Sequence, residues 1–367
     1  MRAFACSNCR SLIFFENSVC ITCGSVLGFH RASAELKVLD PGERGLRFID
    51  TDGGTGSGGG TGADTVAART FRPCANRRLA ECNWLADITA EDGLCDCCRL
   101  TRTRPPDGDQ AALAAFARTE AAKRRLLFEL DFLGLPSVGR DEDPQRGLAF
   151  DLLSSTNGPV TTGHDSGVIT IDMAEGDDAH REALRVRLAE PYRTLLGHLR
   201  HEIGHWYWEI LISGTSHYEG FRQLFGDETV DYAQALATHY DGPPSETWTQ
   251  EYVSHYAAAH PWEDWAETFA HYLHIRDTLQ TSAAWGVTVA GPDLALSVAA
   301  DAQLSAIPVE DPDGFAGVIH TWLPLTFALN AVNRSMGKED LYPFVLAPKV
   351  LEKLRFAHDV VAAAPRH

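Results

Sequence analysis

Hydrophobic residues between positions 191 and 213 recur at the spacing of one face of an α-helix. The residues that share this face are Tyr192, Leu195, Leu199, Ile203, Trp206 and Ile210. The opposite face is polar and carries Thr194, His198, His201, His205 and Glu209. Pro191 suits a first helical position and Gly214 can end a helix, so the pattern predicts a helix from Pro191 to about Ser213 with one face in a core.

A second amphipathic helix is predicted from Pro261 onward, with this proline again in the first turn. Its apolar face holds Trp262, Trp265, Phe269, Tyr272 and Leu273. Its polar face holds Glu263, Asp264, Glu267, His271 and His274. Histidines and carboxylates therefore gather on the polar faces of two separate helices.

The pattern elsewhere predicts further elements. A helical repeat runs from Gln110 to about Phe132, with residues 123–125 on its exposed side. Residues 160–163 and 168–171 have strand composition, and the turn residues between them predict a β-hairpin. This hairpin either pairs with an extended substrate or belongs to the core, and the sequence favours neither. Residues 176–190 predict a charged, solvated helix, and residues 281–357 predict further helix.

The polar face of the first helix contains the run His201-Glu202-Ile203-Gly204-His205. Residues four apart lie about one turn apart on a helix, so both imidazoles can bind one metal ion. Glu202 then lies beside an open coordination position, where a carboxylate can act as general base toward water. The alternative is a surface helix with its histidines in water. Tyr207 and Trp208 flank the polar arc, and this favours a zinc-binding site over a solvent-exposed helix face.

A catalytic zinc site normally has three protein ligands, and the second helix offers the third. Carboxylates in a first helical turn are also explained by the helix dipole, which accounts for Glu263 and Asp264. Glu267 lies a full turn further along, where the dipole explains little. We therefore favour Glu267 over Glu263 as the third ligand and expect Asp264 and His271 to orient a ligand imidazole.

All nine cysteines lie in the first 98 residues, and eight of them have metal-like spacings. Two CxxC pairs predict one structural zinc site at Cys6, Cys9, Cys20 and Cys23. A looser set predicts a second site at Cys74, Cys82, Cys95 and Cys98. In this second set, Cys97 could replace Cys95 or Cys98 as a zinc ligand.

Disulfides are the alternative for these cysteines, and they require an oxidising compartment. The N-terminal residues show neither the apolar stretch nor the cleavage site of a signal peptide, and we find no apolar run of about 18 residues. We therefore expect a cytoplasmic protein with reduced thiols and no membrane contact.

The charge balance is acidic, with 32 Lys+Arg against 50 Asp+Glu and a net charge of −18. Residues 1–63, which include the first cysteine set, hold six basic and six acidic residues. Phosphate binding needs a concentrated positive surface, so nucleic acid is an unlikely partner. A structural or protein-docking role for the cysteine-rich region fits better.

Several segments together resemble a bacterial family of zinc-binding metallopeptidases with an N-terminal zinc ribbon. These segments are residues 192–200 before the HEIGH motif, residues 206–208 after it, and residues 162–165, 167–171, 224–228 and 260–275. The resemblance covers nearly the whole chain. It implies a reaction class but no substrate. It also implies Cys98 as a structural ligand, because Arg-Leu-Thr-Arg-Thr follows this cysteine. The second helix is similar to that of the wider gluzincin group, which implies Glu267 as the third ligand.

The sequence thus predicts an α+β protein with two domains. Residues 1–105 form a zinc-ribbon domain with two four-cysteine zinc sites, and residues 106–367 form a mostly helical zincin-like domain with a small sheet. The glycine-rich residues 53–62 form a flexible segment between the two cysteine sets, and residues 105–108 read as a linker.

The predicted function is zinc-dependent hydrolysis of peptide bonds in a peptide or protein substrate. His201, His205 and Glu267 hold the catalytic zinc, and Glu202 is the general base. The oxyanion donor is open among Tyr256, Tyr240 and His271. The alternatives are a zinc-ribbon scaffold with an inactive or latent peptidase-like domain, and hydrolysis of a non-peptide amide.

Overall fold

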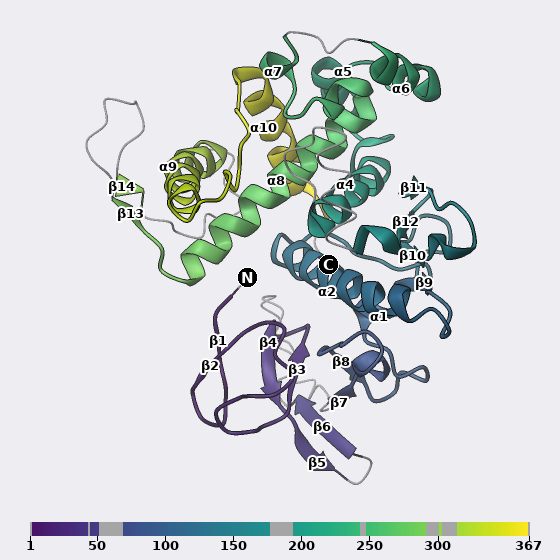
Figure 1. Ribbon diagram of the computed structural model, residues 1–367, viewed down its shortest axis with the longest axis vertical. Coiled ribbons are helices and arrows are strands. Elements are labelled where there is room, and N and C mark those ends of the chain that lie inside the picture. Colours follow the sequence, from purple (N-terminus) through teal and green to yellow (C-terminus); the bar gives the residue numbers. More distant parts are fainter. Residues whose placement is uncertain are drawn as a thin grey trace, which may run out of the picture.

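The computed structural model describes residues 2–42, 45–50, 69–176, 194–242, 247–290, 301–302 and 314–365. Small sheets make up most of the N-terminal region, and helices dominate the remainder (Figure 1). The predicted α+β class, with a small cysteine-rich part and a mostly helical part, is confirmed. The glycine run at 53–62 lies outside the described residues.

The cysteine-rich region is built from short antiparallel strands. Strand β1 (Phe4–Ala5) pairs with β2 (Leu12–Ile13), and β3 (Leu27–His30) pairs with β4 (Glu35–Val38). A four-stranded sheet has the order β5-β6-β7-β8 and comprises Asp40–Gly42, Gly45–Asp50, Arg69–Pro73 and Leu85–Asp87. The turn η1 (Ala75–Arg77) and the one-turn helix α1 (Asp96–Arg99) complete the region.

A second four-stranded sheet joins the two halves of the chain. Its order is β11-β12-β10-β9, and β10 (Ala149–Leu153) runs parallel to both β9 (Thr101–Thr103) and β12 (Val168–Asp172). Strand β11 (Gly163–Asp165) is antiparallel to β12 and forms the edge. The predicted hairpin is present, but its first strand lies at 163–165 and not at 160–163, and its turn is correspondingly shorter than predicted. Ser166 and Gly167 between the two strands have φ of 49° and 82°, as a two-residue hairpin turn of type I′ requires.

Four long helices form the body of the remainder: α2 (Gln110–Phe132), α8 (Pro261–Ala284), α9 (Gly314–Ser335) and α10 (Pro348–Ala363). The motif helix α4 (Leu195–Tyr207) is followed by one π-helical turn, η4 (Trp208–Ile212). Its predicted start at Pro191 and the predicted charged helix up to residue 190 lie outside the described residues, apart from Gly176. The shorter elements are η2 (Ser155–Asn157), η3 (Met173–Gly176), α5 (Tyr218–Phe225), α6 (Tyr232–Asp241), α7 (Trp248–Glu251), η5 (Tyr256–Ala259), β13 (Val289–Ala290) and β14 (Asp301–Ala302).

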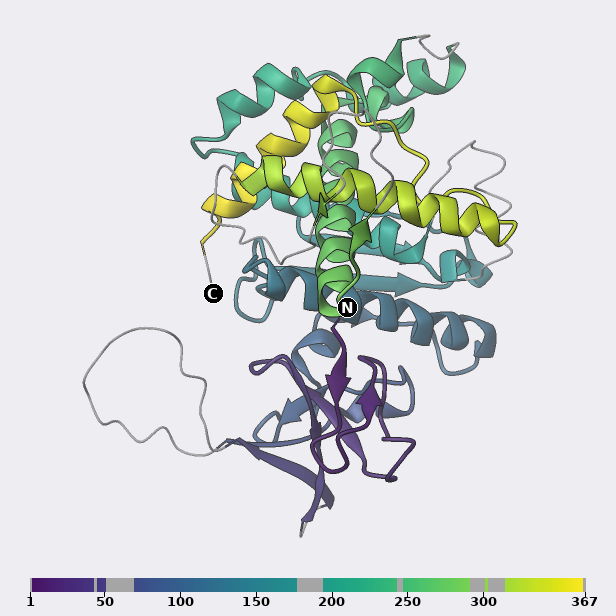
Figure 2. The same cartoon turned by 90° about the vertical axis from the view of Figure 1, so that its left-hand side faces the viewer.

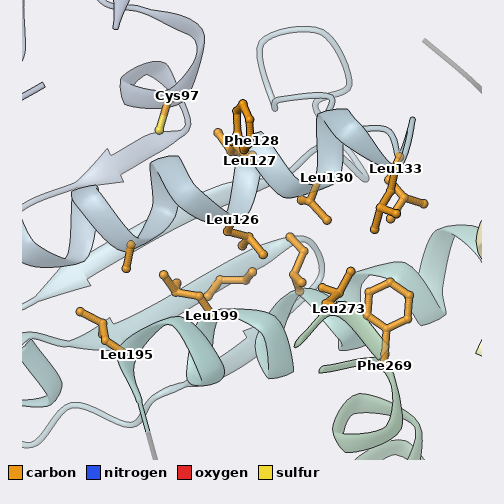
Figure 3. Packing of buried hydrophobic residues seen from close by; sticks show 14 of the residues in the cluster. Cys97, Leu126, Leu127, Phe128, Leu130, Leu133, Leu195, Leu199, Phe269 and Leu273 are labelled. Carbon is orange, nitrogen blue, oxygen red and sulfur yellow. The ribbon is translucent and has the colours of Figure 1, made fainter. Parts of the chain in front are cut away.

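Helix α2 lies between the cysteine-rich region and the motif helix (Figures 1 and 2). On one side, Leu126 and Leu130 face Leu199 of α4 and Leu273 of α8 (Figure 3). On the other side, the Phe128 ring lies 4.9 Å from the Phe15 ring, centroid to centroid. One continuous cluster of buried residues therefore includes both regions. The boundary predicted near residue 105 separates two parts of the sequence, but these parts share a core.

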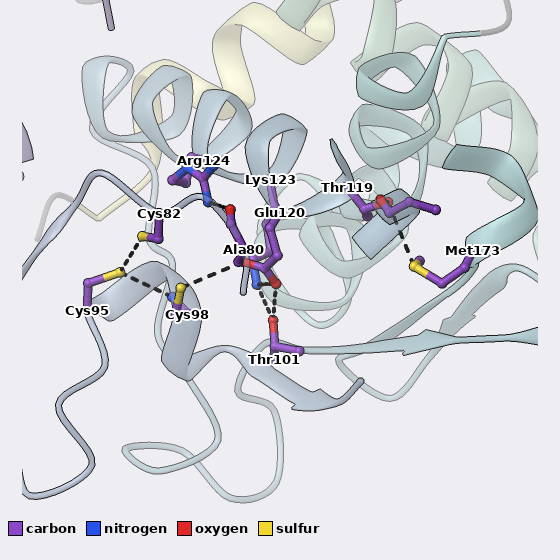
Figure 4. Close-up of polar contacts among 11 residues, drawn as sticks. Ala80, Cys82, Cys95, Cys98, Thr101, Thr119, Glu120, Lys123, Arg124 and Met173 are labelled. Atoms are coloured by element: carbon purple, nitrogen blue, oxygen red, sulfur yellow. Dashed lines mark hydrogen bonds and ion pairs between the residues drawn. The ribbon is translucent and has the colours of Figure 1, made fainter. Parts of the chain in front are cut away.

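The prediction that residues 123–125 lie on an exposed face is wrong for two of the three. Lys123 is completely buried and Arg124 is 4% exposed. Lys123 donates to Glu120, and Arg124 donates to the Ala80 carbonyl oxygen, beside the second cysteine set (Figure 4). Only Arg125 reaches the surface, where it pairs with Glu16. The physical reason is charge compensation, which makes burial of a cation tolerable.

Helix α9 is long and apolar enough to cross a membrane by length and composition alone. This finding corrects the expectation that no segment of the chain meets these criteria. The helix contains Pro324, and Val318, Trp322 and Leu325 on it are buried within the fold. Only 39% of its apolar stretch is buried, and Phe327 and Val332 on it are exposed.

Candidate metal sites

The first cysteine set forms a compact cluster of four thiols in the N-terminal region. The Sγ atom of Cys6 lies 3.8 Å from that of Cys23, and the Sγ atom of Cys9 lies 3.6 Å from that of Cys20. Zn–S bonds of about 2.3 Å in a tetrahedral site place sulfur atoms roughly 3.8 Å apart. The spacing of these four thiols therefore fits one zinc ion.

The second cluster contains Cys74, Cys82, Cys95 and Cys98. The Sγ atoms of Cys82 and Cys95 lie 3.7 Å apart, again at the tetrahedral sulfur spacing. The Cys95 sulfur caps helix α1 by accepting the Cys98 backbone N–H at 3.5 Å. Cys97 is completely buried but lies outside the cluster, near α2 (Figure 3). The open choice among the cysteines at 95–98 is thereby resolved geometrically in favour of Cys95 and Cys98.

The third group lies where α4 meets α8. Helix α4 begins with Thr194, whose side chain accepts the Gly197 backbone N–H, and it presents His201 and His205 on one face. Their Nε2 atoms lie 3.2 Å apart. The Oε2 atom of Glu263 lies 3.0 Å from Nε2 of His201 and 3.6 Å from Nε2 of His205.

These three separations have the size expected for ligands of one tetrahedral zinc ion. Bonds of about 2.0–2.1 Å from zinc to nitrogen or oxygen imply roughly 3.3 Å between neighbouring ligand atoms. The set also has the right chemistry, with two imidazoles and one carboxylate. Three protein ligands leave a fourth position for water or substrate, as in catalytic sites.

The geometry reverses our preference for Glu267 over Glu263. The Oε1 atom of Glu267 lies 2.7 Å from Nδ1 of His201, the ring nitrogen on the far side from the converging Nε2 atoms. Glu267 also accepts a hydrogen bond from the Ser254 hydroxyl at 2.6 Å. It is therefore placed to fix the ring orientation of His201, whereas Glu263 reaches both imidazoles directly.

Close contact between the two helices makes this convergence possible. The Trp265 indole N–H donates to the Gly204 carbonyl oxygen at 2.8 Å. A Cβ atom at residue 204 would lie 3.1 Å from the Cα atom of Ala266. The absence of a side chain at Gly204 therefore allows α8 to pack closely against α4. The small residues Gly204 and Ala266 thus set the distance at which Glu263 meets the histidines.

Glu202 lies beside this group and is 8% exposed. Burial raises the pKa of its carboxyl group, although the charges of His201 and His205 oppose the shift. Its Oε2 atom is buried and has no hydrogen-bond partner among the described residues. A buried carboxylate oxygen without a protein partner is suited to hold a water molecule or its proton.

The two residues expected to orient a ligand imidazole have other partners. The Asp264 carboxylate pairs with the Lys353 ammonium at 2.6 Å, and both side chains are buried. His271 shares a hydrogen bond of 2.7 Å with the Tyr342 hydroxyl. The expected role of orienting a ligand imidazole therefore has no support from these contacts, which tie Asp264 to α10 and His271 to Tyr342.

Three residues that the sequence did not suggest also contact the group. The Tyr232 hydroxyl donates to Oε1 of Glu263 at 2.5 Å, and the Ser254 hydroxyl supports Glu267. His164, on the edge strand β11, lies nearly parallel to His205 with 6.2 Å between ring centroids. Burial lowers the pKa of His164 to about 4, so it is neutral near pH 7. No local motif marks these residues, since each lies outside α4 and α8, the helices that carry the metal-binding side chains.

The three candidate oxyanion donors lie in different surroundings. The Tyr256 ring centroid lies 5.8 Å from that of His201, and burial raises the pKa of its phenol so that the hydroxyl keeps its proton. Tyr240 is 61% exposed, and His271 is buried against Tyr342. Tyr256 is therefore the best-placed donor of the three.

Comparison with known proteins gives matches over almost the whole chain. Residues 112–360 match a family model described as "Putative zinc-binding metallo-peptidase", and residues 3–109 match one described as a zinc-ribbon domain. Uncharacterized proteins of Mycobacterium tuberculosis and Mycobacterium bovis are 51% identical over 362 residues, which cover 98% of this chain and 95% of each relative. No solved structure matches the chain.

Proposed function

The chain belongs to the family of putative zinc-binding metallo-peptidases, and from this premise we propose that it hydrolyses peptide bonds at a zinc ion held by His201, His205 and Glu263. One observation carries the proposal. Three ligand atoms from α4 and α8 converge at tetrahedral spacing beside the buried carboxyl group of Glu202.

Zinc, when bound, lowers the pKa of a water molecule to near 7 and polarises a carbonyl group. Glu202 accepts the proton of the attacking water and later transfers it to the leaving amine. Burial raises the pKa of this carboxyl group, which favours its uptake of the proton. Glu267 holds His201 in one ring orientation, and Tyr232 does the same for Glu263.

The surroundings of the site suggest how a peptide is held. Strand β11 forms an edge of its sheet in the described chain, and His164 on it lies beside His205. An extended substrate can add to such an edge by main-chain hydrogen bonds. The Tyr256 hydroxyl is the proposed donor to the oxyanion, on the other side of His201.

The two cysteine clusters are proposed to hold one structural zinc ion each, which gives three zinc ions per chain. Elemental analysis of protein purified without a chelator tests this count. A cytoplasmic location and a protein partner for the zinc ribbon remain predictions.

The rival function is a zinc-ribbon scaffold whose peptidase-like domain is inactive. Glu202 argues against it, because a structural metal site has no use for a buried carboxyl group beside three ligands. Hydrolysis of a non-peptide amide is the other alternative, and it differs only in substrate.

A peptide-library digestion followed by mass spectrometry separates these functions. We expect the zinc-loaded protein to cleave peptides, to stop after treatment with a chelator, and to resume when zinc is restored. An absence of cleavage in the protein with three zinc ions would favour the scaffold. Cleavage that persists after the loss of zinc would contradict the mechanism.

A further inference from the structure

Arg200 directly precedes the first motif histidine, and its side chain is 4% exposed. It contacts two carboxylates from two other helices. Its Nε atom donates to Glu129 of α2 at 3.0 Å, and its Nη2 atom donates to Asp277 of α8 at 2.8 Å. A single buried cation thus joins α2, α4 and α8.

Helix α2, which carries Glu129, is fixed in place because its other side packs against the cysteine-rich region. Lys123 pairs with Glu120 at 2.6 Å, and Oε2 of Glu120 lies 3.8 Å from the sulfur of Cys98 (Figure 4). The Arg124 guanidinium donates to the carbonyl oxygens of Ala80 and Glu81. Two buried cations therefore face a cluster of thiols that would carry negative charge with zinc.

We propose that Arg200 is a positioning residue for the metal centre, which holds His201 and His205 in register with Glu263. This inference rests on the proposed function, since it assumes that these three residues bind zinc. Arg200 does not touch the ligand atoms. It acts by fixing the helix that carries both histidines.

The geometry of α4 and α8 explains why one contact is insufficient. His201 meets α8 at Glu267, while Arg200 meets it at Asp277. These two carboxylates are ten residues apart, which corresponds to about 15 Å along the helix. Two attachments so far apart fix both the rotation of α4 and its position along α8.

The metal centre is sensitive to such motion. Ligand constellations tolerate displacements of about 0.5 Å or rotations of about 10–20° before function suffers. The Gly204–Ala266 contact sets how closely α4 and α8 approach, but Gly204 has no side chain that would resist a small rotation of α4. The contact of Arg200 with Glu129 on one side and Asp277 on the other provides this resistance.

The test measures zinc affinity of the third site in the full-length protein. Arg200→Met removes the charge but retains most of the apolar part of the side chain. Arg200→Lys keeps the positive charge but lacks the planar guanidinium group, which donates to two carboxylates at once. Asp277→Asn is the second variant, in case the change at Arg200 prevents folding. Arg31→Met is the matched control, because Arg31 also pairs with a carboxylate of α2 but joins the cysteine-rich region to Asp131 instead of joining α4 to α8.

We expect Arg200→Met to weaken zinc binding at the third site by roughly 10- to 100-fold, the range known for residues that support a metal ligand. Arg200→Lys and Asp277→Asn should give smaller losses. The two cysteine sites should stay loaded in every variant. After substitution with cadmium, the NMR signal of the third site should shift in Arg200→Met and stay unchanged in Arg31→Met.

Each alternative has its own result. If Arg200→Met lowers only the unfolding midpoint and leaves zinc affinity and the cadmium signal as in wild type, Arg200 is merely structural and the inference is wrong. If Arg200→Met does not fold, unchanged zinc affinity in Asp277→Asn also overturns the inference. If the wild-type protein binds only two zinc ions, the proposed function itself fails.

Discussion

Gly204 of the motif helix lies so close to Ala266 of α8 that a Cβ atom at residue 204 would be 3.1 Å from the Ala266 Cα atom. Gly204 stands between the two histidines in the sequence, and Ala266 is on the same helix as the Glu263 carboxylate that faces them. The contact makes the packing of two helices a condition for the metal centre.

Gly204→Ala should therefore push α4 away from α8 by a few tenths of an ångström. We expect a loss of about 1–3 kcal/mol in the free energy of unfolding, as is usual for overpacking. Zinc binding at the third site should weaken as well, because Glu263 moves away from the histidines. Urea unfolding and zinc titration measure the two effects. Gly108→Ala is the control, since a Cβ atom at this residue would meet no other atom within 4 Å. Wild-type zinc affinity in Gly204→Ala would show that the contact does not set the ligand spacing.

Glu263→Ala should release zinc from the third site, whereas Glu267→Ala should weaken binding by roughly 10- to 100-fold without abolishing it. The reason is that Glu263 reaches both Nε2 atoms, while Glu267 contacts the far nitrogen of His201. Zinc analysis of the purified variants provides the measurement. Complete loss of zinc in Glu267→Ala with retention in Glu263→Ala would restore the assignment drawn from the sequence.

Removal of residues 1–105 should yield an unfolded or insoluble protein, contrary to what two separate domains would give. The cut deletes strand β9 from the joining sheet and exposes Phe128 and Leu127 of α2. It also leaves the buried Lys123 and Arg124 without the thiols that they face. Circular dichroism and size-exclusion chromatography would detect the effect. A soluble truncation with native helix content would show that the helical part folds alone.

Acid should destabilise the fold through His271. Burial lowers the pKa of this imidazole to about 4 in the folded protein, whereas an unfolded histidine titrates near 6.5. Between these values the unfolded chain binds the extra proton, so stability is lost as the pH falls from about 6.5 to 4. The loss between pH 7 and pH 5 should amount to about 2 kcal/mol for this group.

The measurement compares urea unfolding at these two pH values in wild type and in His271→Gln. The variant cannot gain a proton at residue 271, so its pH dependence should be shallower by about 2 kcal/mol. Equal slopes in both proteins would exclude His271 as a source of acid sensitivity.

Local sequence patterns predict the elements that carry the site but not their mutual placement. Strand composition around turn residues predicts a hairpin but places its first strand at 160–163 where the structure has 163–165, and α8 begins at the predicted proline. The choice between Glu263 and Glu267 is different. Residues four apart share a helix face, so helical periodicity does not distinguish the two carboxylates. The helix dipole accounts for Glu263 in the first turn, which favours Glu267 as the ligand. Which of them reaches the Nε2 atoms depends on how α4 and α8 cross, and Gly204 and Ala266 determine that crossing.

The burial of Lys123 and Arg124 is a second feature that could not be predicted from the sequence. Lys123 and Arg124 read as part of a solvated face because isolated cations are rarely buried. Their burial becomes intelligible only with Glu120 and the thiols of the second cysteine cluster, which approach from elsewhere in the chain. For the same reason, Tyr232 and Ser254 could not be assigned to the site before the fold was known.

The central claim is that the chain hydrolyses peptide bonds with Glu202 as general base at a zinc ion. Glu202→Gln keeps the size and shape of the side chain but cannot accept a proton from water. The decisive measurement is the rate of peptide cleavage by this variant in a sample whose zinc content has been determined. We predict three zinc ions per chain and a rate reduced at least about 100-fold, the lower end for loss of a general base. Wild-type cleavage by the fully zinc-loaded variant would contradict the claim.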